Sequence, residues 1–346
     1  MYEYFVSDEM ARMTIIIGVV VATIIYKRTG LTLGGVIVCG YLALLIAQPL
    51  HILVTLLISY ITYEFVHNVL KKRYMLNGRK LFEVEILVGM FLQVTWLTII
   101  RLLALRSIDL AALYGVGFVI PGVIAHDMGR QGPKSTIGSI LLGVFIVALI
   151  IIPLSAVEQL IPRSVSSLTP QLFRTQPYPY GFPIPLLPYA ILVSILLDLF
   201  AYSRFGARSG GFVTAAYLAL FAVRPFDLMF VAVAAVLTYG FVWFITTYVV
   251  LAFGRIKMGI TILSGVVISW LLEIIVINLS GGYFIPWSGF VVIMPTIAAL
   301  IANDFDREGA TRTSITTALT GAGVFVVMQG VVFLLNLMNL SWFYAA

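Results

Sequence analysis

Two related stretches of the sequence decide the fold: Gly30-Leu-Thr-Leu-Gly-Gly-Val-Ile-Val-Cys-Gly-Tyr-Leu-Ala-Leu44 and, 176 residues later, Gly206-Ala-Arg-Ser-Gly-Gly-Phe-Val-Thr-Ala-Ala-Tyr-Leu-Ala-Leu220. The same shift aligns 26–89 with 202–265 without a gap and gives 19 identities in 64 positions. Shared hydrophobicity would match leucine to valine, but it would not align glycine, proline, arginine and tyrosine. A further parallel, between 124–132 and 301–309, follows at a shift of 177. The pattern predicts a tandem duplication.

The composition indicates an integral membrane protein. Of the 346 residues, 61% are hydrophobic and 10% are charged, against roughly 45–50% and about 25% in ordinary soluble domains. A water-soluble fold could not bury so much apolar side chain, and a disordered chain, a coiled coil and a nucleic-acid-binding module are excluded on the same ground. The single cysteine, Cys39, excludes a disulfide. The three histidines are too scattered in sequence to indicate a metal cluster, so we expect no metal and no other cofactor.

Apolar runs separated by glycine, proline or charge predict twelve segments. They are 13–26, 35–48, 51–70, 83–103, 110–125, 136–157, 187–202, 211–223, 226–250, 258–280, 284–302 and 314–340. A transmembrane helix needs about 20 residues, and two segments in each half are shorter, as 35–48 and 110–125 are in the first. These short segments are predicted to tilt, to thin the bilayer locally or to re-enter from one side.

The basic residues predict the orientation. If all twelve segments cross, 15 of the 21 lysines and arginines lie on one side, in the loops 27–34, 71–80, 126–135, 203–210, 254–257 and 303–313. The positive-inside rule makes that side cytoplasmic and puts both termini outside. We therefore predict an all-α polytopic membrane protein with two parallel six-segment repeats and about twelve transmembrane or partly re-entrant helices.

The predicted boundaries follow from the repeat and from a proline-rich stretch between its copies. Residues 1–157 form the first repeat and 187–346 a second, diverged repeat. The stretch 158–186 contains six prolines, each of which removes a backbone donor and restricts φ. It is therefore predicted to be an extended linker on the extracytoplasmic side.

The first repeat also resembles the membrane subunit of poly-γ-glutamate synthases, the PgsC/CapC family. The resemblance is carried in order by Thr29–Leu42, Gln48-Pro49, Leu57–Tyr63, Met75–Arg79 and Ile120–His126 with Gln131-Gly132. It covers essentially all of 10–155, with Cys39 where the family commonly has proline. The family member is one repeat long, whereas this chain carries two. The second repeat is diverged and is expected to replace a second protomer or to do a different job.

The resemblance implies a membrane subunit of a complex that makes or exports poly-γ-glutamate, a capsule polymer. It further implies a cytoplasmic ATP-dependent ligase related to the Mur ligases (PgsB/CapB-like), an extracytoplasmic CapA-like partner and a place in the cell membrane as a multi-pass protein. The chain has no G-x-x-x-x-G-K-[ST] and no H-E-x-x-H motif. We therefore expect it to be non-catalytic on its own, with the ligase active site on a partner, and to bind no nucleic acid. Two alternatives stay open: a secondary transporter for a small solute and a non-conducting scaffold for the ligase.

The inner loops and loop ends supply the candidate residues for binding the polymer or a partner. Accessible backbone N–H groups of glycine beside positive charge suit a carboxylate-bearing polymer, although tight turns, close helix packing and lipid-phosphate anchoring explain the same residues. The candidates are Arg28, Gly30, Gly34, Gly35, Arg79, His126, Arg204, Gly206, Arg208, Gly210, Gly211, Arg255 and Asn303.

Acidic residues give a weaker indication. Asp198 and Glu273 lie inside apolar runs, and intramembrane carboxylates are commonly functional. Because they would repel a polyglutamate chain, a proton-coupling or helix-pairing role is predicted for them. Glu83 and Glu85 are expected at the inner interface beside Lys80.

Overall fold

The computed structural model describes residues 8–102, 118–160, 180–206, 208–281, 283–287, 290 and 292–338. The chain forms two compact units, Met1–Ile161 and Pro162–Ala346. Within the described residues all regular secondary structure is helical, as the composition predicts.

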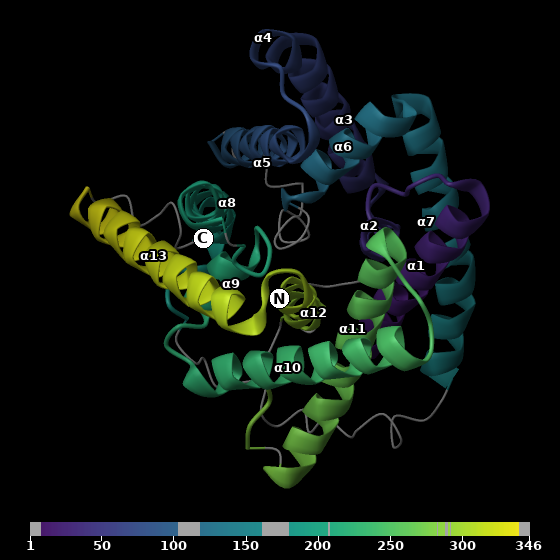
Figure 1. Cartoon of the computed structure of the whole chain (residues 1–346), viewed down its shortest axis with the longest axis vertical. Coiled ribbons are helices and arrows are strands. Elements are labelled where there is room, and N and C mark those ends of the chain that lie inside the picture. The colour runs from purple at the N-terminus through teal and green to yellow at the C-terminus, as the bar shows by residue number, and fades with distance from the viewer. Residues whose placement is uncertain are drawn as a thin grey trace. The chain divides into compact units, whose positions relative to one another are not determined.

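The first unit contains six main helices and one irregular turn (Figure 1). Pro49, Pro121 and Pro133 each lie in the first turn of a helix, where a missing N–H costs nothing. The helix α3 continues through the π-helical turn η1 into the short α4. The bounds are α1 Asp8–Thr29, α2 Val38–Leu44, α3 Pro49–Phe65, η1 Val66–Leu70, α4 Lys71–Tyr74, α5 Gly78–Leu102, α6 Ile120–Gln131 and α7 Pro133–Leu160.

The second unit repeats this order of long and short helices. Its bounds are η5 Ile184–Leu186, α8 Leu187–Phe205, α9 Thr214–Leu220, α10 Pro225–Tyr248, α11 Gly254–Leu279, α12 Ile293–Glu308 and α13 Ala310–Leu337. The helices α2 and α9 both have seven residues and begin 176 residues apart, as do α3 and α10, and α5 and α11. Most of the predicted linker, 161–179, lies outside the described residues.

Eight of the described helices are long and apolar enough to cross a membrane, four in each unit. They are Glu9–Thr29, Pro49–Tyr74, Lys80–Ile99, Pro133–Ala156, Ile184–Arg204, Pro225–Tyr248, Gly254–Leu279 and Ala310–Leu337. The remaining four of the twelve predicted segments correspond to the short helices α2, α6, α9 and α12. A seven-residue helix is about 10 Å long, so α2 and α9 are far too short to cross as continuous helices.

Glycines let the short helices pack closely on the long ones. A Cβ on Gly18 of α1 would lie 2.3 Å from the Cα of Gly40 in α2, and one on Gly122 of α6 would lie 2.4 Å from the Cα of Ile86 in α5. Backbones at this distance exclude any side chain, as in the small-residue contacts of membrane helices. The short helices are therefore seated directly against the backbones of α1 and α5.

The segment between the first long helix and the short helix has the same backbone geometry in both units. Gly34 and Gly35 have φ of 72° and 109°, and Gly210 and Gly211 have φ of 75° and 102°. A Cβ on Gly34 would lie 2.7 Å from Cγ1 of Ile124, and the same atom on Gly210 would lie 2.8 Å from Cγ1 of Ile301. Both the turn and its partner on the next short helix thus recur at spacings of 176 and 177 residues.

Candidate functional site

A buried carboxylate lies between two histidines in the first unit. The Glu85 side chain on α5 has no exposed surface. Its Oε1 lies 2.9 Å from Nε2 of His67, and its Oε2 lies 2.6 Å from Nδ1 of His126. His67 belongs to η1 and His126 to α6, which packs against both α3 and α5 (Figure 1). We call these three residues the histidine–glutamate cluster; one carboxylate joins three elements in it.

The backbone around the cluster is specialised to bring His67 to Glu85. His67 lies in a π-helical turn, and such turns occur frequently at functional sites because they redirect side chains along a helix. A Cβ on Gly129 of α6 would lie 2.3 Å from Nε2 of His67. His67 therefore occupies the space that a side chain at position 129 would fill.

Aromatic rings flank the two imidazoles. The ring centroid of Tyr63 lies 4.8 Å from that of His67, and the ring of Phe82 lies 4.7 Å from that of His126. The His67 and His126 side chains are 14% and 22% exposed, whereas Glu85 is completely covered. The cluster is consequently sealed at its carboxylate and open only at its imidazoles.

The geometry of the cluster is that of charge-assisted hydrogen bonding. Each carboxylate oxygen of Glu85 has one imidazole nitrogen as its partner, at distances typical of N–H donors to a charged acceptor. Among the described residues, no three histidine, cysteine, aspartate or glutamate side chains are arranged to hold a metal ion. The chemistry available to the cluster is therefore the gain and loss of protons.

A neutral junction lies beside the cluster at the end of α6. The backbone N–H of Thr32 donates to Oε1 of Gln131 at 2.9 Å, and Nε2 of Gln131 donates back to the Thr32 carbonyl at 2.7 Å. Ser139 of α7 donates to the same carbonyl at 3.0 Å. These bonds fasten the stretch after α1 to the adjoining ends of α6 and α7.

The second unit has different residues at the cluster positions. Counting 176 residues on, Trp243 stands for His67 and Thr261 for Glu85, and counting 177 on, Asn303 stands for His126. Thr261 donates its hydroxyl to the Lys257 carbonyl of its own helix at 2.9 Å. The Nδ2 of Asn303 lies 3.3 Å from Oδ1 of the adjacent Asp304. No bond among the described residues joins these three positions as in the first unit.

Ion pairs take the place of neutral bonds at the end of the second unit. Arg208 and Glu308 occupy the positions of Thr32 and Gln131, with Nε of Arg208 3.3 Å from Oε1 of Glu308. Asp306, at the position of Gly129, lies 2.6 Å from Nζ of Lys257. The predicted polymer-binding Arg208 is thus already paired with a carboxylate.

The buried acidic residues of the second unit differ in their partners. Asp198 accepts hydrogen bonds from the backbone N–H, at 3.0 Å, and the hydroxyl of Ser209, and Glu273 is buried on α11. Burial raises the pKa of the Asp304 carboxyl to about 6, although the charges of Arg208 and Arg307 oppose this shift. Asp304 lies on α12, outside the helices long enough to span.

The glycines predicted to present N–H groups divide into two kinds. Gly34 and Gly210 are buried beneath isoleucines, and Gly35 and Gly211 are half-buried beside Val123 and Leu300, which favours the close-packing interpretation. Gly30 and Gly206 are exposed, with φ of 71° and 63°, and end α1 and α8.

The predicted arginines lie at helix ends. Arg28 and Arg204 are exposed in the last turns of α1 and α8, and Arg255 is half-buried in the first turn of α11. The side chain of Arg79 lies outside the described residues. The described arginines that are free of an ion pair are therefore placed near the loops, not within the buried cluster.

The sequence interpretation missed two residues of the cluster. Glu83 and Glu85 were expected at an interface beside Lys80, but both are buried. Of the three histidines that appeared scattered, two meet on Glu85, and only His126 was among the candidates. A usable signal is present in the internal alignment, since all three cluster positions change together between the units.

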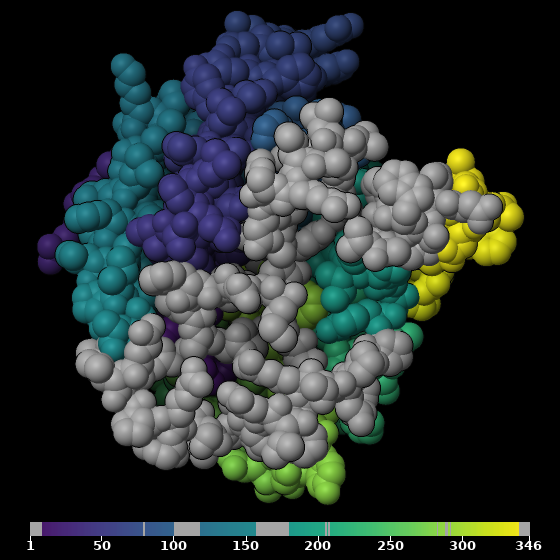
Figure 2. All heavy atoms as spheres, turned by 180° about the vertical axis from the view of Figure 1, so that it is seen from behind, coloured from purple at the N-terminus to yellow at the C-terminus, as the bar shows by residue number. Residues whose placement is uncertain are grey.

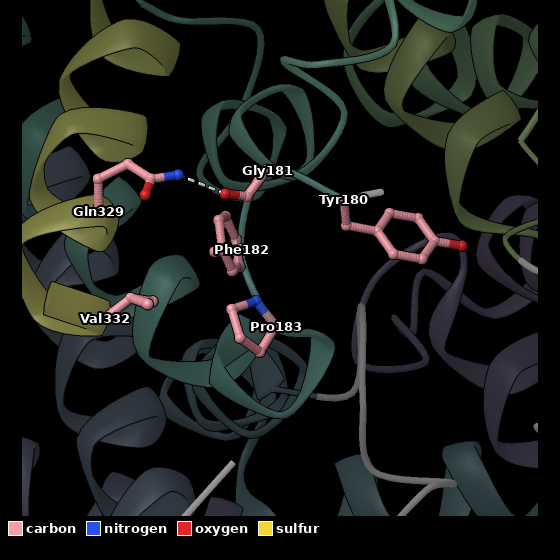
Figure 3. A pocket seen from close by; sticks show the side chains of 6 residues that line it. All are labelled: Tyr180, Gly181, Phe182, Pro183, Gln329 and Val332. Atoms are coloured by element: carbon pink, nitrogen blue, oxygen red, sulfur yellow. Dashed lines mark hydrogen bonds between the residues drawn. The ribbon is translucent and has the colours of Figure 1, made fainter. Parts of the chain in front are cut away.

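The second unit has a shallow pocket of its own (Figure 3). Its volume is about 330 Å³, and it is lined by Tyr180, Gly181, Phe182, Pro183, Gln329 and Val332. The side-chain amide of Gln329 donates to the Gly181 carbonyl, while the Gly181 N–H donates to the Leu220 carbonyl at 2.7 Å. These bonds tie the entry to the second unit to α9 and α13, so the pocket has a structural explanation.

Comparison with known proteins identifies the family. A family model described as capsule biosynthesis CapC matches residues 17–137 and again 193–314. The PGA biosynthesis protein CapC of Bacillus subtilis (strain 168) is 35% identical over 128 residues, which are 37% of this chain and 84% of that protein. The capsule biosynthesis protein CapC of Bacillus anthracis is 34% identical over 128 residues, with the same shares.

No solved structure matches the chain. The two segments matched by the family model together make up more than half of its length, and they include both Gly-Gly turns and both short helices α2 and α9. The resemblance predicted from the sequence is thereby confirmed: the chain belongs to the capsule biosynthesis CapC family.

Proposed function

We propose that the chain is a membrane subunit of a complex that synthesises and exports poly-γ-glutamate, an anionic capsule polymer. The observation that carries the proposal is the match of the CapC family model to both halves of the chain. Eight helices suited to spanning a bilayer support a multi-pass protein of the cell membrane. In this role the chain docks a cytoplasmic Mur-ligase-like, ATP-dependent ligase, works with an extracytoplasmic CapA-like protein and helps to pass the polymer across the membrane.

The proposed architecture is a parallel duplication. Residues 1–157 and 187–346 are two CapC-like repeats with the same orientation, joined by an extracytoplasmic linker at 158–186, and both termini lie outside. The matching helix starts and Gly-Gly turns support it. So does the size of the relatives, because a match of 128 residues already covers 84% of one of them. One relative therefore corresponds to about one unit of this chain.

The proposed docking surface for the ligase is the basic turn at α4. Lys72, Arg73, Tyr74 and Met75 are all exposed, and α4 lies at one end of the first unit in Figure 1. The dark blue side chains of this part of the chain project at the same end in Figure 2. The corresponding residues of the second unit, 247–250, carry no charge. The first unit therefore offers the more basic surface to an acidic partner.

The test compares surface polymer in cells with and without the chain. Removing the chain should abolish surface polymer, measured as glutamate released from the cell surface by acid hydrolysis. The double variant Arg79→Ala plus Arg255→Ala should do the same with the protein still inserted in the membrane, since these arginines follow glycine in both repeats. Undiminished polymer from cells lacking the chain would reject the proposed function.

Two further readouts separate the alternative functions. Co-purification of a ligase with the wild-type chain, weakened by salt because surface charges are screened, supports the complex. A secondary transporter for a small solute would purify without a ligase and would leave polymer unchanged. A non-conducting scaffold would bind the ligase, yet polymer made in the double variant would still reach the surface.

A further inference from the structure

The histidine–glutamate cluster is a feature that the family membership does not explain. It occurs in the first unit alone among the described residues, and it requires a fully covered carboxylate, a π-helical turn and a glycine at position 129. A structural role alone is served in the second unit by Thr261, which bonds only within its own helix. Ionisable residues placed inside a membrane domain are commonly functional.

The proton inventory of the cluster follows from its distances. With Glu85 ionised, His67 donates from Nε2 and His126 donates from Nδ1, so both imidazoles are neutral and the cluster has a charge of −1. The remaining ring nitrogens, Nδ1 of His67 and Nε2 of His126, are then the proton acceptors. One proton bound at either nitrogen creates an imidazolium against the carboxylate and brings the charge to 0, and a second brings it to +1.

The surroundings do not supply a competing counter-charge at Glu85. Within the described part of the chain, the hydrogen bonds of the Glu85 carboxylate go to the two histidines alone. The other ionisable groups close in sequence to the cluster on the packed elements are Tyr63, Glu64, Lys80, Glu83, Asp127 and Arg130. Glu64 is bonded to Asn68 on the same helix, Arg130 and Lys80 are exposed, and Glu83 and Asp127 are buried acids. The buried acids favour uptake of a positive charge.

We propose that Glu85, His67 and His126 form a proton-binding site whose occupancy sets how tightly η1 and the short helix α6 are held against α5. Protonation converts neutral hydrogen bonds into ion pairs in a site of low exposure, where charge-assisted bonds are stronger. Loss of the proton loosens two of the three elements at once. Because the two histidines share one carboxylate, they titrate as a coupled pair and not as independent groups.

The direct test uses the three histidines of the chain as reporters. The full chain, labelled with ¹⁵N-histidine and held in lipid nanodiscs, gives three imidazole signals that His→Gln variants assign, and His51 serves as the internal reference. Glu85→Gln should lower the proton affinity of His67 and of His126 at least tenfold, which is a shift of one pH unit or more. The signal of His51 should stay in place.

Matched variants keep the test decisive. Glu83→Gln, on the same helix and also buried, should leave the titration of His67 and His126 unchanged. If Glu85→Gln does not insert, His126→Gln reports instead: His67 should then titrate in one step where the wild type shows two. Single-step titration of both histidines in the wild type, with no effect of Glu85→Gln, would overturn the proposal.

A second readout links the site to the polymer and rests on the proposed function. Glu85→Gln at normal protein level should reduce surface polymer at least tenfold, and Glu83→Gln should not. Coupled titration with undiminished polymer in Glu85→Gln would reject the link between proton binding and polymer passage. Undiminished polymer in cells lacking the chain would reject the proposed function and leave the titration result standing.

Discussion

The two units share a backbone plan and differ in the chemistry built on it. The first unit places a buried glutamate between two histidines and joins Thr32 to Gln131 through neutral hydrogen bonds. The second unit has ion pairs at the equivalent junction, between Arg208 and Glu308 and between Lys257 and Asp306. Positive-φ glycines and proline helix starts are the same in both, because few residues can replace them. Polar side chains are free to change, so function is to be sought in the differences between the units.

The largest expected effect comes from the backbone contact of α5 with α6. Gly122→Ala places a Cβ 2.4 Å from the Cα of Ile86, and overpacking that only the backbone can relieve should destabilise the chain by about 3 kcal/mol. The equivalent position of the second unit is already Ala299, facing Gly265. The free energy of unfolding in mixed micelles measures the effect.

Gly138→Ala on α7 is the control, because a Cβ there meets nothing within 4 Å. It should be neutral or slightly stabilising, by up to about 1 kcal/mol, since alanine is the better helix former. Equal losses for the two variants would mean that the close contact of α5 with α6 is not a determinant of the fold.

The next effect tests the clearance that His67 needs. Gly129→Ala places a Cβ 2.3 Å from Nε2 of His67 and should push the imidazole off Glu85, at a cost of about 2 kcal/mol for a lost hydrogen bond to a buried charged group. In the second unit the equivalent Asp306 is exposed, and Asp306→Ala should cost about 0.5 kcal/mol or less. A larger loss for Asp306→Ala than for Gly129→Ala would contradict the contrast between the units.

The pH dependence of stability should also differ between the units through Asp304. Its folded pKa is about 6, above an unfolded value of about 3.9, so the folded chain holds this proton more tightly than the unfolded chain. The contribution of Asp304 to the free energy of unfolding is therefore greatest below about pH 4, falls as the pH rises through 6 and is flat above it. The fall should be about 2 kcal/mol, and Asp304→Asn should remove it. An unchanged slope in that variant would assign the pH dependence to other groups.

The smallest effect concerns the exchanged junction. Arg208→Thr plus Glu308→Gln gives the second unit the pair found in the first, and the double variant should be within about 0.5 kcal/mol of the wild type. Each single variant strands one partner, and the coupling energy should be about 1 kcal/mol because the side chains are 29% and 15% exposed. Additive losses in the cycle would show that the ion pair is not an equivalent of the Thr32–Gln131 bonds.

Helix class and repeat spacing could be predicted from the sequence, because they depend on composition and on residues with special backbones. Pro49 and Pro225 begin helices where the pattern predicts, and the Gly-Gly turns precede α2 and α9. The short segments were less predictable. The run 284–302 was expected to be one segment, but α12 extends only from Ile293 to Glu308, and Phe284 to Trp287 are not helical.

The cluster could not be predicted, because its members are far apart in sequence. Glu85 lies 18 residues after His67 and 41 before His126, and only the packing of α6 against α3 and α5 brings them together. Helical periodicity on α5 places Glu85 on a face but does not name the residues opposite. The glycine at 129 has meaning only once the position of His67 is known.

The central claim is that the chain carries two CapC-like repeats in the same orientation, and paired cysteine labelling tests it most directly. In a Cys39→Ala background, single cysteines at Asn77 and at the equivalent Phe253 are probed on intact cells with a membrane-impermeant maleimide, and Ser167→Cys is the outside control. The account predicts that Ser167→Cys is labelled at once and that Asn77→Cys and Phe253→Cys are labelled only after permeabilisation. Labelling of Asn77→Cys and Phe253→Cys from opposite sides would contradict a parallel duplication.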